Sequence, residues 1–304
     1  LSNNYNANFL IGSSNYMIIE ADEYDRSFLQ LNPAISLITS IDKDHVDTYA
    51  SERDMIRAYY QFYSNTRNQK SIQFINKIKR KALTKSNVCM PFAVSNKIKK
   101  FLNKEKNDFC FSLINMEKEI ENFSNSMLQS MSFHNIQNAA MASHVAFKIG
   151  LNRSQIKKAF STFKGIKRRF EYHSNTQDLV LIDDYAHHPK ELEVLIKSVR
   201  LLHPKRKIFL IFQPHLFSRT KHLENEFIET LSLVDSLALL KIYPARELPI
   251  PDVTSVNLLK QISLDDKWIL DETNLRSVIL NHKPNLIVVA GAGDVYKLIP
   301  NIKS

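Results

Sequence analysis

Apolar runs of strand length alternate with helix-like segments through the C-terminal half of the chain. Two of these segments carry an apolar stripe at helical spacing, 190–203 and 223–234. Strands that are apolar on both faces are typical of a parallel sheet covered by helices on both sides. The pattern therefore predicts an α/β fold. Four runs are apolar along most of their length: 179–185, 207–215, 236–244 and 285–293.

The N-terminal half shows the same alternation less cleanly. Helices are predicted at 134–150, with Asn135 as N-cap and Gly150 as the C-terminal stop, and at about 153–163. A domain boundary is predicted near residue 168, which divides the chain into 1–168 and 169–304. Strands are predicted at 16–23, 35–45 and 71–76, and a hairpin is predicted to start at 109–115.

Polar motifs follow each strand of the predicted C-terminal sheet. Open parallel sheets bind ligands at the carboxyl ends of their strands, so these motifs are expected to share one functional edge. Ordinary turns would favour Gly, Asn and Pro, whereas these motifs are rich in His and Arg. The motifs are DDYAHHP (183–189), QPHLFSRT (213–220), YPARELP (243–249) and GAGD (291–294).

The composition fits a soluble globular protein, with 44% hydrophobic and 24% charged residues. No apolar run approaches the roughly 18 to 20 residues of a membrane span, and the first residues do not resemble a secretory signal. Cys89 and Cys110 lack CxxC spacing and are expected to be reduced thiols. A cytoplasmic location is therefore expected, without a membrane partner.

The net charge of +10 comes from one window. Residues 67–106 hold 12 Lys and Arg against a single acid, Glu105. Nucleic-acid binding through this window is one alternative, and salt-dependent binding would support it. The window lacks a recognisable binding motif and suitably placed aromatic residues, so a solvated lysine-rich face is favoured and no nucleic-acid partner is expected.

Two residues at the ends of N-terminal apolar runs are candidate cation ligands. Glu20 and His45 each close such a run, and a carboxylate and an imidazole can share Mg²⁺ or Mn²⁺. Their spacing alone is weak support, because magnesium sites seldom have a sequence signature of their own.

A series of motifs gives these residues a wider context. EADEYDRSFLQLNP (20–33) and TSIDKDHVDTY (39–49) are followed by HNIQNA (134–139) and IKRRF (166–170), and then by the C-terminal motifs DDYAHHP, QPHLFSRT and GAGD. In this order, over about 16–294, they resemble the Mur ligases, and in particular the branch that joins L-alanine to UDP-N-acetylmuramate. The resemblance implies part of the central ATPase domain followed by a Rossmann-like C-terminal domain with a mostly parallel sheet.

The resemblance also implies a role for each matching residue. Glu20 and His45 are expected to bind Mg²⁺ or Mn²⁺, and Arg219 to pair with the substrate carboxylate and the migrating phosphoryl group. The nucleotide is expected to contact Asn135 and Asn138 at adenine, Asp184 at ribose, and Arg169. The amino-acid and muramate end is expected to contact His187 and His188, with His188 and His215 orienting the amine.

The implied activity is an ATP-dependent amide ligase of peptidoglycan synthesis, acting on UDP-N-acetylmuramate and L-alanine through an acyl phosphate. Two alternatives remain: a ligase that attaches a preformed tripeptide to the same UDP-sugar, and a non-catalytic remnant or binding module.

Two departures from the family pattern qualify this expectation. The glycines stand at 12, 150, 165, 291 and 293, and none of these five begins the family's phosphate-binding loop. The family's UDP-binding domain and this loop would precede Leu1, so the chain is expected to be a fragment or a split subunit, with a separate polypeptide as a candidate partner. Leu216 also stands where several relatives carry an arginine, which would weaken the grip on the substrate carboxylate.

Overall fold

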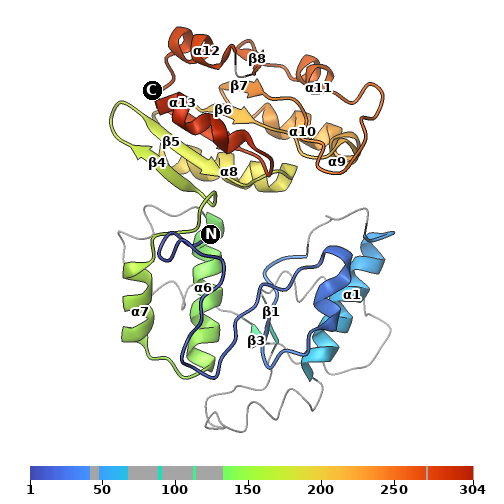
Figure 1. Ribbon diagram of the computed structural model, residues 1–304, viewed down its shortest axis with the longest axis vertical. Helices are drawn as coiled ribbons and strands as arrows, with labels where there is room; N and C mark the ends of the chain where they lie inside the picture. The colour runs from blue at the N-terminus through green and yellow to red at the C-terminus, as the bar shows by residue number, and fades with distance from the viewer. Residues whose placement is uncertain (42–47, 68–87, 91–111, 114–132, 272, 304) are drawn as a thin grey trace. The chain divides into compact units, whose positions relative to one another are not determined.

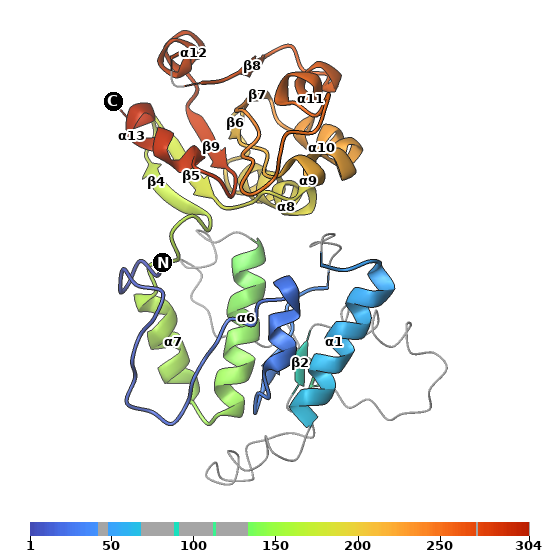
Figure 2. The same cartoon turned by 45° about the vertical axis from the view of Figure 1, so that its right-hand side comes forward.

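The computed structural model describes residues 1–41, 48–67, 88–90, 112–113, 133–271 and 273–303. The chain divides into two compact units (Figures 1 and 2). Unit 1 comprises Leu1–Leu10, Gln129–Phe133 and Phe163–Ser304, and unit 2 comprises Ile11–Leu128 and His134–Thr162. The N-terminal residues join unit 1 through backbone bonds such as Asn3 N–H to the Gly165 carbonyl, 3.0 Å. The domain boundary near residue 168 stays a prediction.

Unit 1 is built on a six-stranded sheet with the order β4-β5-β9-β6-β7-β8. Five strands run parallel, and β4 pairs antiparallel with β5 at the edge. This confirms the predicted α/β fold with a mostly parallel sheet. The strands are β4 (Glu171–Asn175), β5 (Val180–Asp184), β6 (Phe209–Phe212), β7 (Ser236–Leu239), β8 (Lys267–Ile269) and β9 (Leu286–Ala290).

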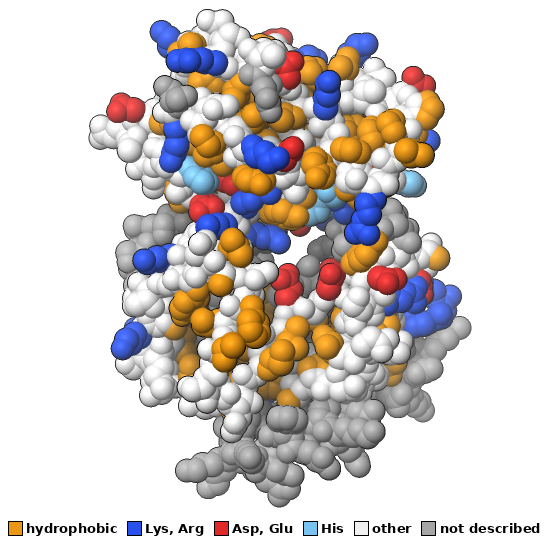
Figure 3. Space-filling view, viewed as in Figure 1, with side chains coloured by type: hydrophobic (Ala, Val, Ile, Leu, Met, Phe, Trp, Pro, Cys, Tyr) orange, Lys and Arg blue, Asp and Glu red, His pale blue; other side chains and the backbone are white. Residues whose placement is uncertain are grey.

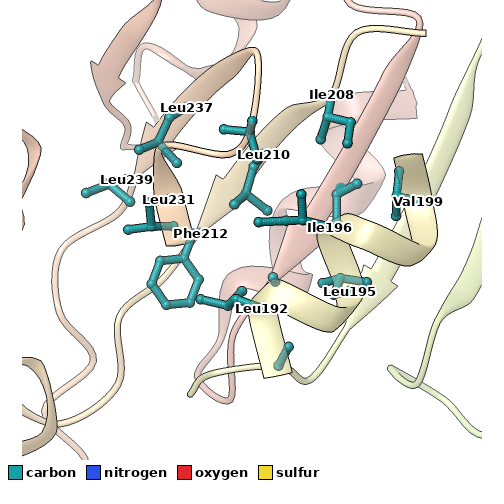
Figure 4. Packing of buried hydrophobic residues seen from close by; sticks show 14 of the residues in the cluster. Leu192, Leu195, Ile196, Val199, Ile208, Leu210, Phe212, Leu231, Leu237 and Leu239 are labelled. Atoms are coloured by element: carbon teal, nitrogen blue, oxygen red, sulfur yellow. The ribbon is translucent and has the colours of Figure 1, made fainter. Parts of the chain in front are cut away.

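One face of this sheet packs against α8, α10 and α11. Alternate strand residues such as Leu210 and Phe212 point to this face, where they meet Leu192 and Ile196 of α8 (Figure 4). The apolar stripe predicted for 190–203 is therefore the buried side of a helix. The helices are α8 (Pro189–Leu202), α10 (Glu224–Leu231) and α11 (Ser255–Gln261).

The opposite face is covered as well. Phe209 and Ile211 alternate with the residues of the first face and pack against Leu275 of α12 and Ile299 of α13. Because both faces are buried, the central strands β6 and β9 are apolar at every position, as the sequence indicated. The covering elements are α12 (Leu275–His282), the 3-10 helix η2 (Val295–Leu298) and α13 (Ile299–Lys303).

Unit 2 holds a short parallel sheet with the order β1-β2-β3. Its main described core lies between α1 and the 3-10 segment η1, where Phe28 packs against Tyr59 and Phe62. The elements are η1 (Tyr24–Gln30), β1 (Ser36–Leu37), α1 (Glu52–Arg67), β2 (Val88–Met90), β3 (Ser112–Leu113), α6 (Phe133–Lys148) and α7 (Arg153–Thr162).

The predictions for unit 2 fare unevenly. Within 35–41, the described part of the run 35–45, only Ser36 and Leu37 form a strand. β3, within 109–115, pairs in parallel with β2. The helix at 153–163 is confirmed as α7. The strand at 71–76 and the rest of the expected hairpin lie outside the described residues.

The strand predicted at 16–23 is wrong. This segment has no regular structure, and Met17, Ile18 and Ile19 are 78%, 94% and 53% exposed. A strand needs a neighbour to satisfy its backbone N–H and C=O groups, and none of the described strands pairs with this segment. Hydrophobic side chains consequently lie on the surface of unit 2 (Figure 3).

The ends of α6 correct one prediction and confirm another. The helix begins at Phe133, so Asn135 lies in its first turn and is not the N-cap. Gly150 ends the helix as predicted: its φ is +96°, a conformation that favours glycine, and its N–H donates to the Phe147 carbonyl at 3.0 Å.

Replacing Leu192 by alanine tests the packing of α8 on the sheet. Leu192 is fully buried, so Leu192→Ala is expected to lower the free energy of unfolding by about 2–5 kcal/mol. Leu201→Ala is the matched control, because Leu201 lies on the same helix and is 77% exposed; its effect should stay within about 0.5 kcal/mol. Urea unfolding followed by Trp268, the chain's single tryptophan, reports on unit 1. Equal losses in the two variants would contradict this packing.

Candidate functional site

The carboxyl ends of four parallel strands carry the candidate site of unit 1. β5, β6, β7 and β9 end at Asp184, Phe212, Leu239 and Ala290. β9 lies between β5 and β6, although it comes last in the chain, so GAGD stands between DDYAHHP and QPHLFSRT. The four motifs predicted to share one edge are brought together there.

Aromatic side chains form a continuous row along this edge. The ring centroids of Tyr185 and His187 lie 5.5 Å apart, and those of His187 and His215 lie 5.8 Å apart. The row ends with Tyr243, whose ring stacks on His215 at 5.6 Å with an interplanar angle of 11°. The Tyr243 N–H also donates to the Pro214 carbonyl at 2.8 Å. Sequence reasoning did not single out Tyr243, although it begins the YPARELP motif.

His188 is the N-cap of α8 and is buried. Its Nδ1 accepts a bond from the Lys190 N–H at 3.3 Å, while Glu191 reaches back to the His188 N–H at 3.2 Å. This capping box fixes the ring, and an accepting Nδ1 places the proton of a neutral imidazole on Nε2. Pro189 follows at the first helical position, where a missing N–H costs nothing. His188 therefore has a fixed orientation and a defined tautomer.

Arg219 lies on α9 (Phe217–His222) and is 8% exposed. Its Nη1 is 3.5 Å from Nδ1 of His215. A guanidinium at the end of this row suits a carboxylate or phosphate, because it offers two parallel donors.

The helix that carries Arg219 is tied down at its start. Glu247 accepts hydrogen bonds from the Ser218 backbone N–H, at 2.9 Å, and from the Ser218 hydroxyl. Burial by itself would raise the pKa of Glu247, but these bonds, the Phe217 amide and the nearby Arg219 charge hold that pKa below its usual value. Glu247 is thus a charged anchor for α9, and sequence reasoning missed it.

Leu216, which replaces the arginine of several relatives, precedes α9 with a φ of +69°. This backbone conformation is unfavourable for a branched side chain. The Leu216 N–H bond to the Tyr243 carbonyl, 2.9 Å, helps to hold it.

Asp184 ends β5 and is partly buried. Burial raises the pKa of Asp184 to about 6, although its oxygens accept bonds from the Ala186 N–H at 2.8 Å and the Phe170 N–H at 2.7 Å, and Arg169 is near. Both oxygens serve to hold the backbone. The ribose contact expected for Asp184 stays a prediction.

The two arginines of IKRRF behave differently. Arg168 is partly buried and donates to the carbonyls of Gly291 and of Gly293, the latter at 3.1 Å. Arg169 is exposed, with its guanidinium carbon 5.4 Å from the centre of the Tyr185 ring. Arg168 holds the GAGD turn in place, whereas Arg169 remains accessible to a ligand.

Gln213 joins the ends of β6 and β9. Its side chain donates to Asp294 at 2.9 Å and accepts from the Val295 N–H at 3.0 Å. A Cβ on Gly291 would lie 2.8 Å from the Gln213 carbonyl oxygen, and one on Gly293 would lie 2.3 Å from its side-chain oxygen. The glycines of GAGD are therefore required by the close approach of the two strands.

A cavity of about 160 Å³ opens beside this junction. Four of its eight lining residues are charged. The lining residues are Gln213, Leu240, Lys241, Leu270, Asp271, Asp294, Lys297 and Leu298.

The remaining candidates belong to unit 2. Glu20 is exposed, and His45 lies outside the described residues. Asn135 is half-buried and Asn138 is exposed on α6. The metal and adenine roles of these four residues stay predictions.

Comparison with known proteins agrees with this architecture. The family profile "Mur ligase middle domain" matches residues 4–146, and "Mur ligase, glutamate ligase domain" matches 168–293. A curated UDP-N-acetylmuramate–L-alanine ligase of Cytophaga hutchinsonii is 35% identical over 315 aligned positions, covering 100% of this chain and 66% of the relative. A relative of the same name from Porphyromonas gingivalis is 33% identical, covering 100% of this chain and 67% of its own length.

A solved structure shows the same fold. The crystal structure of UDP-N-acetylmuramate-alanine ligase from Thermotoga maritima matches with a TM-score of 0.60 and 20% identity, over 91% of this chain and 60% of that one. The fold defines an α/β protein with a mostly parallel sheet, whose strand-end motifs share one edge. The chain belongs to the Mur ligase family, and it spans about two thirds of the length of the curated relatives that it matches.

No helix in the described parts of the chain is long and apolar enough to cross a membrane.

Replacing Glu247 by alanine tests the anchor of α9. Glu247→Ala should lower the free energy of unfolding by about 1 kcal/mol at pH 7, the usual cost of losing a cap. Because the folded-state pKa lies below the ordinary value of 4.5, this stabilisation is complete above that value and is lost as the pH falls through the folded pKa. The difference in the free energy of unfolding between wild type and variant should therefore become smaller in acid. The measurement is urea unfolding followed by Trp268 fluorescence from pH 7 to pH 3. Glu229→Ala is the control, because Glu229 is an exposed residue of α10. A gap that does not change with pH would refute the charged anchor.

Proposed function

We propose that this chain provides the carboxylate-activating and amine-binding part of an ATP-dependent ligase that joins L-alanine to UDP-N-acetylmuramate in peptidoglycan synthesis. The observation that carries the proposal is the edge of unit 1, where Arg219 lies beside His215 and the His215 ring packs against that of His187. His188, whose ring is fixed as the N-cap of α8, follows His187 directly in the sequence. The curated relatives of that name, at 33–35% identity along the whole chain, support it. The reaction is placed in the cytoplasm.

The chemistry requires activation of a carboxylate. Joining a carboxylate to an amine in water is uphill, so a carboxylate oxygen of the muramate first takes the γ-phosphoryl group of ATP. The alanine nitrogen then attacks the carbonyl carbon, a tetrahedral intermediate forms, and phosphate leaves as the amide is made; the amine gives up its proton in this step. Positioning of the two reactants can contribute on the order of 7 to 11 kcal/mol.

Arg219 is proposed to bind the carboxylate and the migrating phosphoryl group. The buried guanidinium is held on an anchored helix, so its donors keep a fixed direction. His215 and His188 are proposed to orient the amine, and His187 to contact the amino-acid or muramate end.

The nucleotide contacts are proposed from the family motifs: Asn135 and Asn138 in unit 2, and Arg169 and Asp184 in unit 1. Glu20 and His45 are proposed ligands of Mg²⁺ or Mn²⁺. Glu20 fits this role as an exposed carboxylate, a hard oxygen donor that a cation can reach. A divalent cation bound there would neutralise charge on the triphosphate.

Activity is proposed to require the family's phosphate-binding loop, which none of the five glycines of this chain begins. This chain would then work as a fragment or split subunit that is completed by residues outside it. The exposed apolar segment Met17–Ile19 supports the proposal, since it lies next to Glu20 and has the composition of a buried strand.

Reconstitution tests the need for the loop. Phosphate release dependent on ATP, UDP-N-acetylmuramate and L-alanine should be absent with this chain alone. It should appear when the polypeptide encoded immediately upstream is added, and be lost again when the lysine of its phosphate loop is replaced by alanine. Activity of the chain alone would contradict the proposal. A folded but inactive mixture would favour a remnant, and activity with a tripeptide but not with alanine would favour the recycling reaction.

Replacing Arg219 by lysine in the active mixture tests its role. A lysine keeps the charge but loses two-point pairing, so Arg219→Lys should lower kcat/KM on the order of 100-fold. Lys221→Gln, an exposed change on the same helix, should leave the rate near that of the wild type. A similar rate for Arg219→Lys and the wild type would exclude the proposed role.

A further inference from the structure

A cluster of three metal-ligating side chains lies on unit 1, on strands β4 and β5. It consists of Glu171, His173 and Asp183, and one ligand atom from each lies within 4.8 Å of the others. None of the roles proposed for the ligase reaction uses these residues.

The strand pairing builds this cluster. Glu171 and Asp183 are direct partners in the antiparallel ladder, so their side chains share one face of the sheet. The register then shifts between Tyr172 and Ser174, which leaves His173 as the extra residue of a bulge. A bulge redirects a side chain, and here Nε2 of His173 lies 3.8 Å from both Glu171 Oε2 and Asp183 Oδ2.

Two carboxylates placed opposite each other on neighbouring strands repel and need compensation. Arg168 supplies part of it, with Nε 3.6 Å from Asp183 Oδ1, and its backbone N–H donates to Glu171 at 2.8 Å. The Asn3 amide also donates to Glu171, at 3.3 Å.

The Nε2 atom of His173 has no comparable hydrogen bond. Its Nε2 and the Asp183 Oδ1 are buried atoms without a hydrogen bond to any described residue. Asp183 is 1% exposed, and its Oδ1 has the ion-pair contact with Arg168 but no hydrogen bond, so burial of this carboxylate is costly.

The distances favour a cation over direct hydrogen bonding. A separation of 3.8 Å is too long for a hydrogen bond, which needs roughly 2.7–3.2 Å between nitrogen and oxygen. An ion that bonds nitrogen and oxygen at about 2.1 Å can bridge such a gap, because two of its bonds span up to about 4.2 Å.

We infer that Glu171, His173 and Asp183 bind a divalent transition-metal cation of the Zn²⁺ class. One imidazole nitrogen and two carboxylate oxygens form a mixed donor set that suits zinc better than magnesium or calcium. Glu171 and His173 are half-buried, which leaves an entry path from solvent, and Asp183 forms the buried floor. The bound ion would pin the edge strand β4 to β5 independently of nucleotide binding.

Zinc binding to the untagged, chelator-stripped chain tests this inference. Calorimetric titration with Zn²⁺ at pH 7.5 should show one equivalent bound, and thermal unfolding followed by Trp268 should shift upward with Zn²⁺. His173→Gln should weaken binding at least about 10- to 100-fold and remove the shift, since loss of an outer-shell partner alone has that effect. His222→Gln is the control, because His222 is an exposed residue of α9; this variant should bind Zn²⁺ as the wild type does.

Circular dichroism of His173→Gln establishes that the variant is folded, and Co²⁺ absorption supplies a second readout through the ligand set. Absence of Zn²⁺ binding by the wild type would overturn the inference. Unchanged binding by folded His173→Gln would overturn it as well. Loss of Zn²⁺ binding in His215→Gln together with unchanged binding in His173→Gln would also contradict the inference, because it would indicate that the ion binds at the aromatic row.

Discussion

The burial of both faces of the six-stranded sheet is the constraint on which unit 1 depends. Helices cover each face, so the central strands β6 and β9 carry apolar side chains at every position. Polar chemistry is left to the strand ends, and the parallel direction gathers those ends at one edge. The row from Tyr185 to Tyr243 is a direct consequence.

The insertion of β9 between β5 and β6 sets the geometry of that edge. It brings the GAGD turn against Gln213, so closely that only glycine fits at two positions. Arg168 then holds the turn by its carbonyls. The neighbouring arginine, Arg169, is exposed, so the two arginines of one motif have different surroundings.

Family membership and activity rest on different parts of the molecule. The motifs of this chain match the middle and C-terminal domains of the Mur ligases. The resemblance assigns phosphate binding in that family to a glycine-rich loop, and none of the five glycines of this sequence begins such a loop. The residues at the edge of unit 1 are therefore positioned by unit 1 itself, whereas catalysis is proposed to need the phosphate-binding loop from outside this chain.

The sequence alone determined the α/β class, the strands β5, β6, β7 and β9, the helices α8 and α10, and the strand-end motifs, because hydrophobic periodicity and turn chemistry are local signals. It failed at 16–23, where apolar character predicts a strand but hydrogen bonding requires a neighbour. Tertiary structure alone decided the position of β9, the anchoring of Arg219 by Glu247, and the bulge that turns His173 toward Asp183. Each of these features depends on contacts between residues distant in sequence or on a shift in strand register, and no local pattern encodes either.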